Sequence, residues 1–309
     1  MEDMKDQGSM MGHRHEACAL LVVVSIFLLW DTIRALLVYA WTHESSSHIV
    51  LIPALVIFLI FTERGKIFRV VQSSPVLGLT LILSGVALLW QASRKLPFAA
   101  GNRYLVTAAL GLGLIWVGGF LLCYGNQAAR AAVFPLLFLL LMVPLPDSLL
   151  EKTIYLLQQG STEVSYLLFK TVGVPVLRNG FLLSVPGITI EVAKECSGIR
   201  SSMALLITCL LAAHLFLKTP WKMLLFVALA VPLAVIKNGI RITTLTLLSL
   251  YVDPSFLRGS LHRDGGFVFF LIALAILAPF LLLLQKSEDQ HGHLSLGHAT
   301  PRKSAAPQC

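Results

Sequence analysis

The sequence is built mainly from apolar runs that are long enough to cross a lipid bilayer. The stretch from Phe267 to Leu284, for example, contains no charged residue. A helix needs about 20 apolar residues to span the hydrocarbon core of a membrane. Charged residues make up only 13% of the 309 positions, whereas soluble domains carry about 25%. These features predict an all-α polytopic membrane protein whose surroundings are a lipid bilayer.

Hydropathy predicts about eight transmembrane helices. They are expected at residues 17–41, 48–62, 75–92, 104–123, 131–145, 198–217, 221–236 and 264–285. The apolar stretch 242–252 is too short for a separate span, so we expect it to continue the preceding helix or to form a re-entrant segment on the same side. The polar ends predict a disordered cytoplasmic arm at 1–16 and a disordered cytoplasmic tail at 286–309, on either side of a membrane domain over 17–285.

Two segments between the fifth and sixth spans have a different character. Residues 148–172 mix apolar with charged and amide side chains, which predicts an amphipathic helix at the membrane interface. Residues 174–192 are strand-like, with an Asn-Gly pair at 179–180 and a Pro-Gly pair at 186–187. Asparagine followed by glycine between apolar flanks is a strong hairpin signal. We therefore expect a small extracytoplasmic β-hairpin or meander that leads the chain to Cys196.

Three polar clusters interrupt the apolar second half of the chain. They are Lys194-Glu195-Cys196-Ser197-Gly198-Ile199-Arg200, Lys237-Asn238-Gly239-Ile240-Arg241 and His262-Arg263-Asp264-Gly265-Gly266. If the N-terminus is cytoplasmic, eight spans bring all three clusters to the outer face of the membrane. The basic link 63–74 then lies inside, as the positive-inside rule requires. The link that carries Arg94, Lys95 and Arg103 lies outside in this topology and argues against it.

The clusters contain the side chains of a cysteine-based acyl-transfer site. Cys196 stands where a helix is expected to begin, and the positive end of a helix dipole favours a thiolate. Ser197 and Gly198 are candidate caps of that helix. An imidazole at His262 can take the thiol proton. A guanidinium at Arg241 can stabilise the thiolate or the oxyanion of a tetrahedral intermediate.

Other members of the clusters are expected to support this site. They are Glu195, Ser197, Gly198, Arg200 and Asn238. Glu195 opposes a thiolate at the neighbouring position, and Lys194 partly offsets this effect. Any one cluster alone is better explained by cations that extend to lipid headgroups, as Lys237 and Arg241 can. Three clusters on one face favour a site over that explanation.

Several other functions are disfavoured. His43 and His48 resemble a zinc-protease motif but stand five residues apart, so a helix turns them to different faces. The sequence contains no phosphate loop and no serine-hydrolase motif, and we expect no metal and no cofactor. The net charge of +8 comes from cations in short links between the apolar runs. Such cations set the orientation of the helices in the membrane and do not indicate nucleic-acid binding. Asp31 and Arg34 share a helix face and are expected to form a structural ion pair.

The second half of the chain, residues 130–285, resembles the exosortases, a group of membrane cysteine transpeptidases. The matching segments are Phe134-Pro135, Pro144-Leu145-Pro146, Gly173-Val174-Pro175-Val176, Glu191-Val192 leading into Cys196-Ser197-Gly198, Pro232-Leu233-Ala234, Asn238-Gly239-Ile240-Arg241 and His262 before Gly266. The resemblance implies that Cys196 is the nucleophile and that Arg241 and His262 complete the site. It also implies substrate proteins with a C-terminal sorting signal, made of a Pro-Glu-Pro-type motif, a transmembrane helix and a basic tail.

The same resemblance implies a location and partners. The acyl-enzyme would pass the cleaved protein to an acceptor at a bacterial inner membrane that makes exopolysaccharide, with the active site on the periplasmic face. A separate accessory protein is a possible partner. Two alternatives stay open, a non-catalytic scaffold of a polysaccharide export system and a polytopic transporter whose path is lined by Asp31, Arg34, Arg241 and His262. A transporter predicts internal repeats, and no clear repeat is present.

Overall fold

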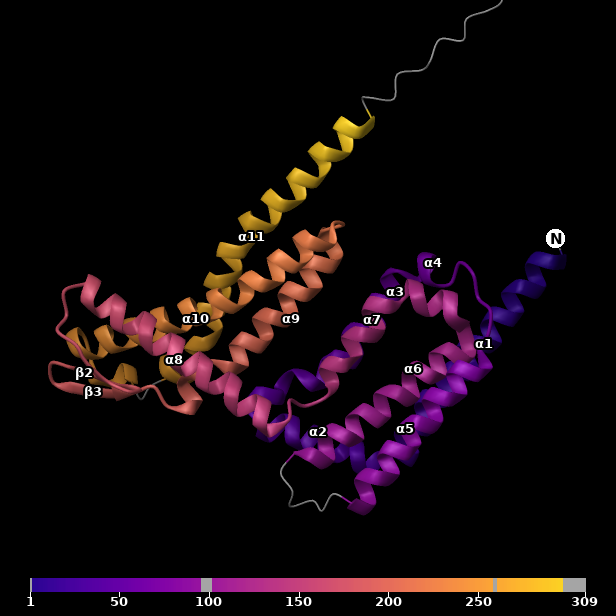
Figure 1. Cartoon of the computed structure of the whole chain (residues 1–309), viewed down its shortest axis with the longest axis horizontal. Helices are drawn as coiled ribbons and strands as arrows, with labels where there is room; N and C mark the ends of the chain where they lie inside the picture. The colour runs from indigo at the N-terminus through magenta and orange to yellow at the C-terminus, as the bar shows by residue number, and fades with distance from the viewer. Residues whose placement is uncertain (1, 96–101, 258–259, 297–309) are drawn as a thin grey trace, which may run out of the picture. The chain divides into compact units, whose positions relative to one another are not determined.

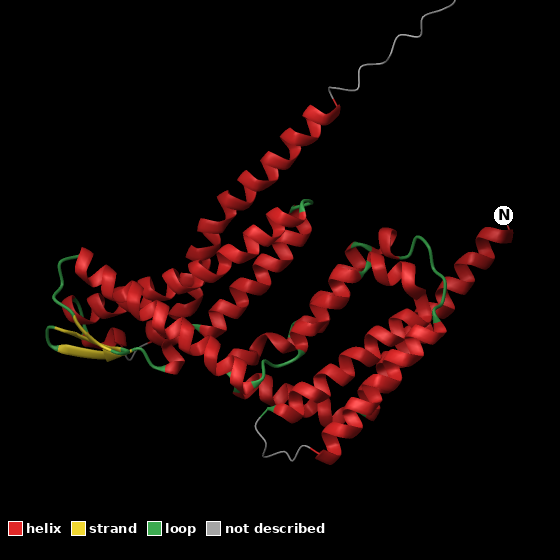
Figure 2. Cartoon of the chain, in the orientation of Figure 1, coloured by secondary structure: helices red, strands yellow, loops and turns green. Residues whose placement is uncertain are grey.

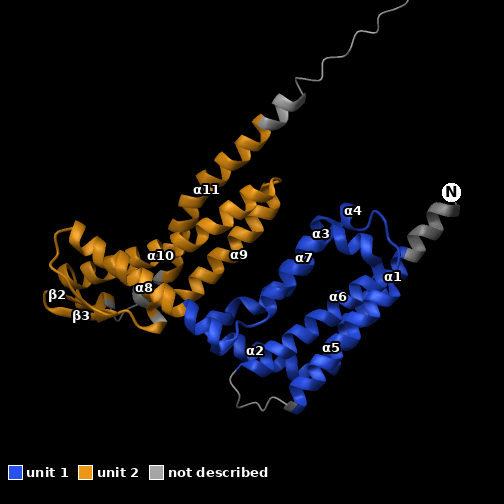
Figure 3. Cartoon of the chain, in the orientation of Figure 1, with its two compact units in different colours: residues 1–153 blue, residues 154–309 orange. Residues whose placement is uncertain are grey.

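The structure is a computed structural model that describes residues 2–95, 102–257 and 260–296 (Figure 1). Within these ranges, the side chains of residues 2–10, 95, 195, 257, 260–265 and 291–296 lie outside the description. Helices dominate the described residues, whose strands form one small sheet (Figure 2). The chain divides into two compact units, residues 1–153 and 154–309 (Figure 3).

The first unit is helical. It contains α1 (Glu2–Leu28), α2 (Trp30–Thr42), the 3-10 helix η1 (Glu44–Val50), α3 (Ile52–Thr62), α4 (Arg64–Ile67), α5 (Pro75–Lys95), α6 (Arg103–Ala131), α7 (Val133–Phe138), the 3-10 helix η2 (Leu139–Met142) and the start of α8 (Asp147–Thr171). The second unit contains the rest of α8, the strands β1 (Leu177–Asn179), β2 (Leu182–Val185) and β3 (Ile188–Glu191), the 3-10 helix η3 (Lys194–Ser197), α9 (Ile199–Phe216), α10 (Pro220–Tyr251), the 3-10 helix η4 (Pro254–Leu257) and α11 (Ser260–Leu296).

Seven helical segments among the described residues are long and apolar enough to cross a membrane. They are Met11–Leu28, Glu44–Thr62, Pro75–Arg94, Arg103–Ala131, Ile199–Phe216, Pro220–Tyr251 and Gly266–Gln290. An eighth results if the bent pair Val133–Met142 and Asp147–Thr171 counts as one broken span. This pattern confirms the prediction of an all-α polytopic membrane protein with about eight spans.

The N-terminal arm is helical rather than irregular. Residues 2–16, expected to be disordered, form the beginning of α1. The Arg14 Nη1 donates to the Cys123 carbonyl at 3.1 Å, and the His15 Nδ1 lies 2.7 Å from the Tyr124 hydroxyl. Polar side chains that looked unsuited to a folded segment are therefore satisfied by groups of α6.

The long first span is interrupted. Leu29 separates α1 from α2 with φ −108° and ψ 24°, so residues 17–41 do not form one continuous helix. Asp31 and Arg34 both lie in α2 and are exposed. They form no salt bridge in the described part of the chain, so the ion pair expected between them is absent.

The two C-terminal helices are longer than expected. α10 is one helix of 32 residues, so residues 242–252 continue the seventh span rather than forming a re-entrant segment. Its length is about 48 Å at 1.5 Å per residue, which exceeds the ~30 Å hydrocarbon core. Residues 286–296, expected to be disordered tail, extend α11. The rest of the predicted tail, 297–309, lies outside the described residues.

The helix predicted at 148–172 is present as α8, and its polarity is informative. The fifth span predicted at 131–145 corresponds to α7 and η2, which end at Met142 and reach span length only together with α8. The proline-containing stretch 143–146 separates them from α8. The buried side chains of α8 are mostly polar and include Gln158, Ser161, Thr162 and Ser165. By contrast, Leu156 on the same helix is 64% exposed. A polar stripe of α8 thus faces the protein interior, and its location at the membrane interface stays a prediction.

The α5 and α6 backbones approach each other through two pairs of glycines. A Cβ atom on Gly85 would lie 2.5 Å from the Gly111 carbonyl oxygen, and one on Gly78 would lie 2.8 Å from that of Gly118. The two glycines of each helix stand seven residues apart, so the close contact repeats along the helix pair. Small residues permit such close approach between helices in a membrane. We call these four residues the glycine seam.

The predicted β-meander is confirmed in the second unit. Its strands pair antiparallel in the order β1-β2-β3. Two-residue loops join them, Gly180–Phe181 and Pro186–Gly187. One face of the sheet packs on α8 and α10 through an apolar cluster that includes Phe169, Leu183 and Val192. The last strand therefore leaves the sheet from a fixed position.

We expect Gly85→Ala to destabilise the protein by about 1–3 kcal/mol, because the added methyl group must push the α5 and α6 backbones apart. The shift is measured by thermal or SDS-induced unfolding of the detergent-solubilised protein. Gly113→Ala is the control, because Gly113 lies on the partner helix α6 and its added Cβ would meet no neighbouring atom within 4 Å. Equal unfolding midpoints for the two variants would show that the glycine seam does not limit the packing.

Candidate active site

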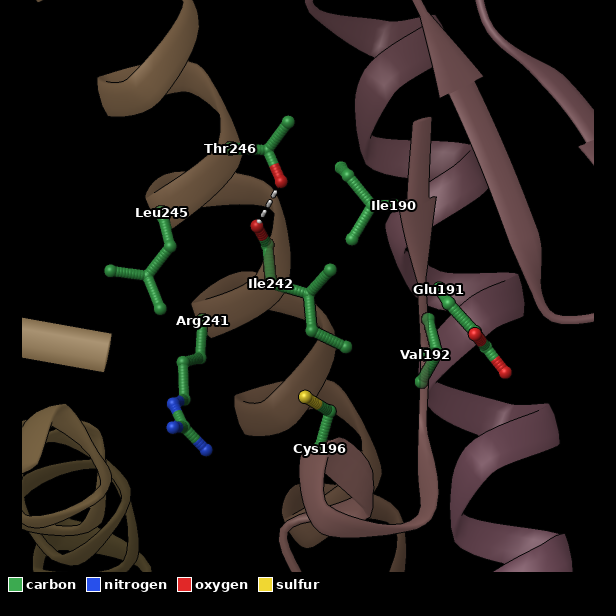
Figure 4. A pocket seen from close by; sticks show the side chains of 8 residues that line it. All are labelled: Ile190, Glu191, Val192, Cys196, Arg241, Ile242, Leu245 and Thr246. Atoms are coloured by element: carbon green, nitrogen blue, oxygen red, sulfur yellow. Dashed lines mark hydrogen bonds between the residues drawn. The ribbon is translucent and has the colours of Figure 1, made fainter. Parts of the chain in front are cut away.

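A small pocket lies between the β3 strand and α10 in the second unit (Figure 4). It is lined by Ile190, Glu191, Val192, Cys196, Arg241, Ile242, Leu245 and Thr246. Its volume is about 30 Å³, which is the space of a small group such as a water molecule. Figure 4 shows the Cys196 sulfur pointing toward α10, the helix that carries Arg241. Two of the three residues predicted to be catalytic therefore share one pocket.

Cys196 lies in a tight turn between β3 and α9. The turn contains η3, in which the Cys196 N–H donates to the Ala193 carbonyl at 2.9 Å. Gly198 follows with φ 71° and ψ 20°, a left-handed conformation, and α9 begins at the next residue. The left-handed region is costly for residues with a side chain. This glycine therefore allows the chain to pass from the thiol directly into a helix.

The two candidate caps of α9 differ in their roles. Gly198 is the N-cap residue, and no side chain caps the helix. Ser197 is fully buried, and its Oγ has no hydrogen-bond partner among the described residues. The expectation that the Ser197 hydroxyl caps α9 is therefore wrong.

Asn238 fixes the Cys196 turn to two helices. Its Nδ2 donates to the Cys196 carbonyl at 2.9 Å and to the Ser161 Oγ of α8 at 2.9 Å. The side chain is 1% exposed, so water does not compete for these bonds. A Cβ atom on Gly198 would lie 2.7 Å from the Asn238 Oδ1. The amide is thus packed against the turn as well as bonded to it.

Lys237, the residue before Asn238, is also buried. It is 4% exposed, and its Nζ donates to the Ser201 Oγ of α9 at 2.5 Å. The Ser201 Oγ in turn donates to the Gly198 carbonyl at 3.1 Å. Lys237 and Arg241 are four residues apart and so share one face of α10. The alternative that Lys237 extends to lipid headgroups is therefore wrong, and its cation supports the Cys196 turn.

Buried polar side chains of α8 bond to the two segments on either side of Cys196, the end of β3 and the middle of α10. The Gln158 Nε2 donates to the Val192 carbonyl at 2.8 Å, where the chain leaves the sheet. The Ser165 Oγ donates to the Gly239 carbonyl of α10 at 3.2 Å. A Cβ atom on Gly239 would lie 2.4 Å from Val164 of α8, so a glycine is needed for this close contact. Sequence analysis missed the contribution of α8, although polar residues at helical spacing were visible there.

The other predicted residues are placed as follows. Arg200 is exposed on α9 and does not line the pocket, so the structure gives it no contact with the site. Glu195 lies in η3, and its side chain is outside the described part of the chain. His262 lies in the first turn of α11, the helix that packs against α9 and α10. The His262 side chain also lies outside the description, and its distance from Cys196 stays untested.

The pocket combines a thiol and a guanidinium in largely apolar surroundings. A thiolate is the nucleophilic form of cysteine. A fixed cation stabilises negative charge more strongly in an apolar pocket than in water. Ile190, Val192 and Leu245 supply such surroundings. The arrangement is therefore suited to nucleophilic attack on a carbonyl group.

We expect Asn238→Leu to free the Cys196 turn. The change removes two buried hydrogen bonds at similar side-chain volume, at a cost of about 1–3 kcal/mol in unfolding free energy. Hydrogen–deuterium exchange of the turn amides, residues 194–198, should become at least about tenfold faster. Thr208→Ala is the control, because it removes one hydrogen bond within α9, from Thr208 Oγ1 to the Ala204 carbonyl. Unchanged exchange in Asn238→Leu would contradict the anchoring role.

Gly198→Ala should cost more than the same change at Gly187. Both glycines have positive φ, 71° and 82°, so each alanine pays about 1–2 kcal/mol for a left-handed backbone. Only the Cβ at Gly198 also meets Asn238, whereas that at Gly187 has nothing within 4 Å. Unfolding midpoints give the difference. The combined cost of Gly198→Ala and Asn238→Ala should fall below the sum of the two, and strict additivity would show that the contact is unimportant.

The family model described as transmembrane exosortase matches residues 40–279. The match includes the sheet, the Cys196 turn and all of α10. Neither a curated protein nor a solved structure matches the chain. Because the matched range covers well over half of the 309 residues, the chain belongs to the transmembrane exosortase family.

Proposed function

We propose that the protein is a membrane cysteine peptidase or transpeptidase that cleaves the C-terminal sorting signal of exported proteins. Membership of the exosortase family supports the class of reaction. The observation that carries the proposal is that Cys196 and Arg241, far apart in sequence, line one pocket. Asn238 and Lys237 support it further, because both hold the cysteine-bearing turn from the helix that presents Arg241.

The first half of the reaction forms an acyl-enzyme. The Cys196 thiolate attacks the carbonyl carbon of the scissile peptide bond and makes a tetrahedral intermediate. The bond between that carbon and the amide nitrogen then breaks, the amine leaves with a proton, and the cleaved protein remains on Cys196 as a thioester. We assign the stabilisation of the thiolate and of the oxyanion to Arg241. We assign the transfer of the thiol proton to the leaving amine to His262.

The second half of the reaction regenerates the enzyme. An acceptor amine or hydroxyl, or water, attacks the thioester carbonyl, and the carbon–sulfur bond breaks. The acceptor loses a proton, and Cys196 regains one. The product is a protein joined to the acceptor, or a released protein if water attacks. Cys196, Arg241 and His262 supply all the groups that these steps require, without a cofactor.

The proposed location follows from the topology and the substrate. With a cytoplasmic N-terminus and eight spans, the Cys196 turn lies on the periplasmic face of a bacterial inner membrane. A substrate held by its own transmembrane helix would present its Pro-Glu-Pro-type motif at the same depth. The link to exopolysaccharide and surface display, and a separate accessory protein, belong to the same proposal. Glu195, Ser197 and Gly198 keep their supporting roles in it through the turn that contains Cys196.

Cys196→Ala tests the proposal. The strain should accumulate the uncleaved precursor of a secreted reporter that ends in a Pro-Glu-Pro-type motif, a transmembrane helix and a basic tail. Immunoblotting should show the mature form reduced at least about 10³-fold, as expected when a nucleophile is removed. Cys209→Ala is the matched control, because Cys209 is 1% exposed in the apolar cluster of α9, α10 and α11, away from the pocket.

Membrane insertion of both variants is checked by fractionation, so that loss of processing cannot reflect loss of the protein. A hydroxylamine-sensitive thioester between Cys196 and the cleaved reporter would identify the intermediate directly. Wild-type amounts of mature reporter in the Cys196→Ala strain would instead favour a non-catalytic scaffold or a transporter.

A further inference from the structure

The β3 strand has one free edge. The sheet order is β1-β2-β3, and no described strand pairs with the outer side of β3. The loop Pro186–Gly187 is closed by the pair Val185 and Ile188. In an antiparallel ladder, alternate residues direct their N–H and C=O groups to the partner strand. Ile188 and Ile190 therefore face β2, and the main-chain groups of Thr189 and Glu191 face outward.

The Val192 N–H confirms this alternation, because it donates to the Phe181 carbonyl at 3.0 Å. The outward groups of Thr189 and Glu191 thus lie along one edge, on the side away from β1 and β2. Such an edge can accept a further strand through main-chain hydrogen bonds. Edge strands that remain unpaired in a folded protein are commonly shielded or used for recognition.

This edge runs into the pocket that contains Cys196. Three consecutive residues, Ile190, Glu191 and Val192, line the pocket. Since successive side chains of a strand point to opposite faces, three in a row can line one pocket only if the strand backbone borders it. Figure 4 shows Ile190 and Glu191 on β3 and Val192 just after it, on the side of the pocket opposite the α10 residues Ile242 and Leu245, with the Glu191 carboxylate directed away from α10.

The two walls of the pocket offer different contacts. The α10 wall presents side chains, since the main-chain groups of a helix interior are bonded within the helix. The β3 wall presents the outward main-chain groups of Glu191, and those of Thr189 lie further along the same edge, beyond the residues that line the pocket. An extended peptide along this edge could therefore pair its main chain only with β3, while the small apolar pocket beside Cys196 has room for one small group of the peptide. The Gln158 bond to Val192 and the Asn238 bond to Cys196 hold this edge and the thiol in a fixed relation.

We propose that the sorting segment of the substrate binds as an added strand on the outer edge of β3, with its scissile carbonyl beside Cys196. This inference rests on the proposed function and adds how the substrate is held. The occupant is an extended polypeptide segment, because the edge offers main-chain partners at strand spacing. Recognition then has two parts: main-chain pairing with Thr189 and Glu191, which does not depend on the peptide sequence, and the fit of one small group into the apolar pocket beside Cys196.

Thr189→Pro tests the edge directly. Proline removes the outward N–H and places its ring on that side, yet leaves the ladder between β2 and β3 intact, as proline does on edge strands. Processing of the reporter should fall at least about tenfold relative to Thr189→Ala, which corresponds to loss of one hydrogen bond and a steric block. Thr189→Ala isolates the side chain, whose hydroxyl lies 3.1 Å from that of Ser184.

The second measurement does not depend on the folding of a proline variant. A photo-cross-linking amino acid is placed at Thr189 or at Leu177 in the Cys196→Ala protein, which retains the uncleaved reporter. Leu177, Ser184 and Thr189 form one row across the sheet, so these two sites are at the same level on opposite edges. Leu177 is 79% exposed, which makes it a matched and accessible control. Cross-links to the reporter should form from position 189 at least about five times more than from 177, as expected for a side chain within strand-pairing distance.

The outcomes separate the two proposals. Equal processing by Thr189→Pro and Thr189→Ala, together with loss of processing in Cys196→Ala, would overturn the edge and leave the peptidase in place. Equal cross-linking from the two positions, or a cross-link from position 189 to a second copy of this chain, would also overturn it. Normal processing in Cys196→Ala would overturn the proposed function itself.

Discussion

The site depends on one buried amide, that of Asn238. A thiol in a loop keeps a fixed position only if the loop backbone is anchored. Here the Asn238 amide of α10 anchors the loop by donating a hydrogen bond to the Cys196 carbonyl. The same amide nitrogen reaches Ser161 on α8, so three segments meet at one group. Gly198 leaves room for it, and no larger residue would fit at that distance. The geometry of the candidate site is therefore set by a residue that carries no reactive group.

The polar stripe of α8 serves the same end. Polar side chains in a membrane protein are costly unless they find partners inside the protein. Gln158, Ser161 and Ser165 find theirs in the strand exit, in Asn238 and in the backbone of Gly239. The helix thus exposes its charged side chains, as an ordinary amphipathic helix does, but also buries a stripe of uncharged polar side chains. Its role is to align the sheet, the turn and α10.

Much of the fold could be predicted because its signals are local. Apolar runs indicate spans, and the turn pairs at 179–180 and 186–187 indicate the meander. The pocket was predictable in part, because Arg241 and Cys196 stand in polar clusters that a simple topology brings to one face. The position of the His262 side chain stays a prediction.

Other features could not be predicted because they depend on distant partners. The helical arm is held by Arg14 and His15, whose partners on α6 are 109 residues away. The break at Leu29 has no proline or glycine at the junction to announce it. Lys237 looks like a surface cation until Ser201, on another helix, is placed beside it. The exposure of Arg200 likewise depends on how α9 is turned.

The length of α10 has a consequence for how the protein meets membranes of different thickness. A helix longer than the hydrocarbon core adapts to a thinner bilayer by tilting. Lys237 and Asn238 lie on that helix and are joined by hydrogen bonds to Ser201 and to the Cys196 carbonyl. The turn that contains Cys196 therefore moves with α10. A tilt of this part of α10 therefore displaces the Cys196 thiol and the Arg241 guanidinium together, and hydrophobic mismatch alters their depth in the membrane more than the spacing between them.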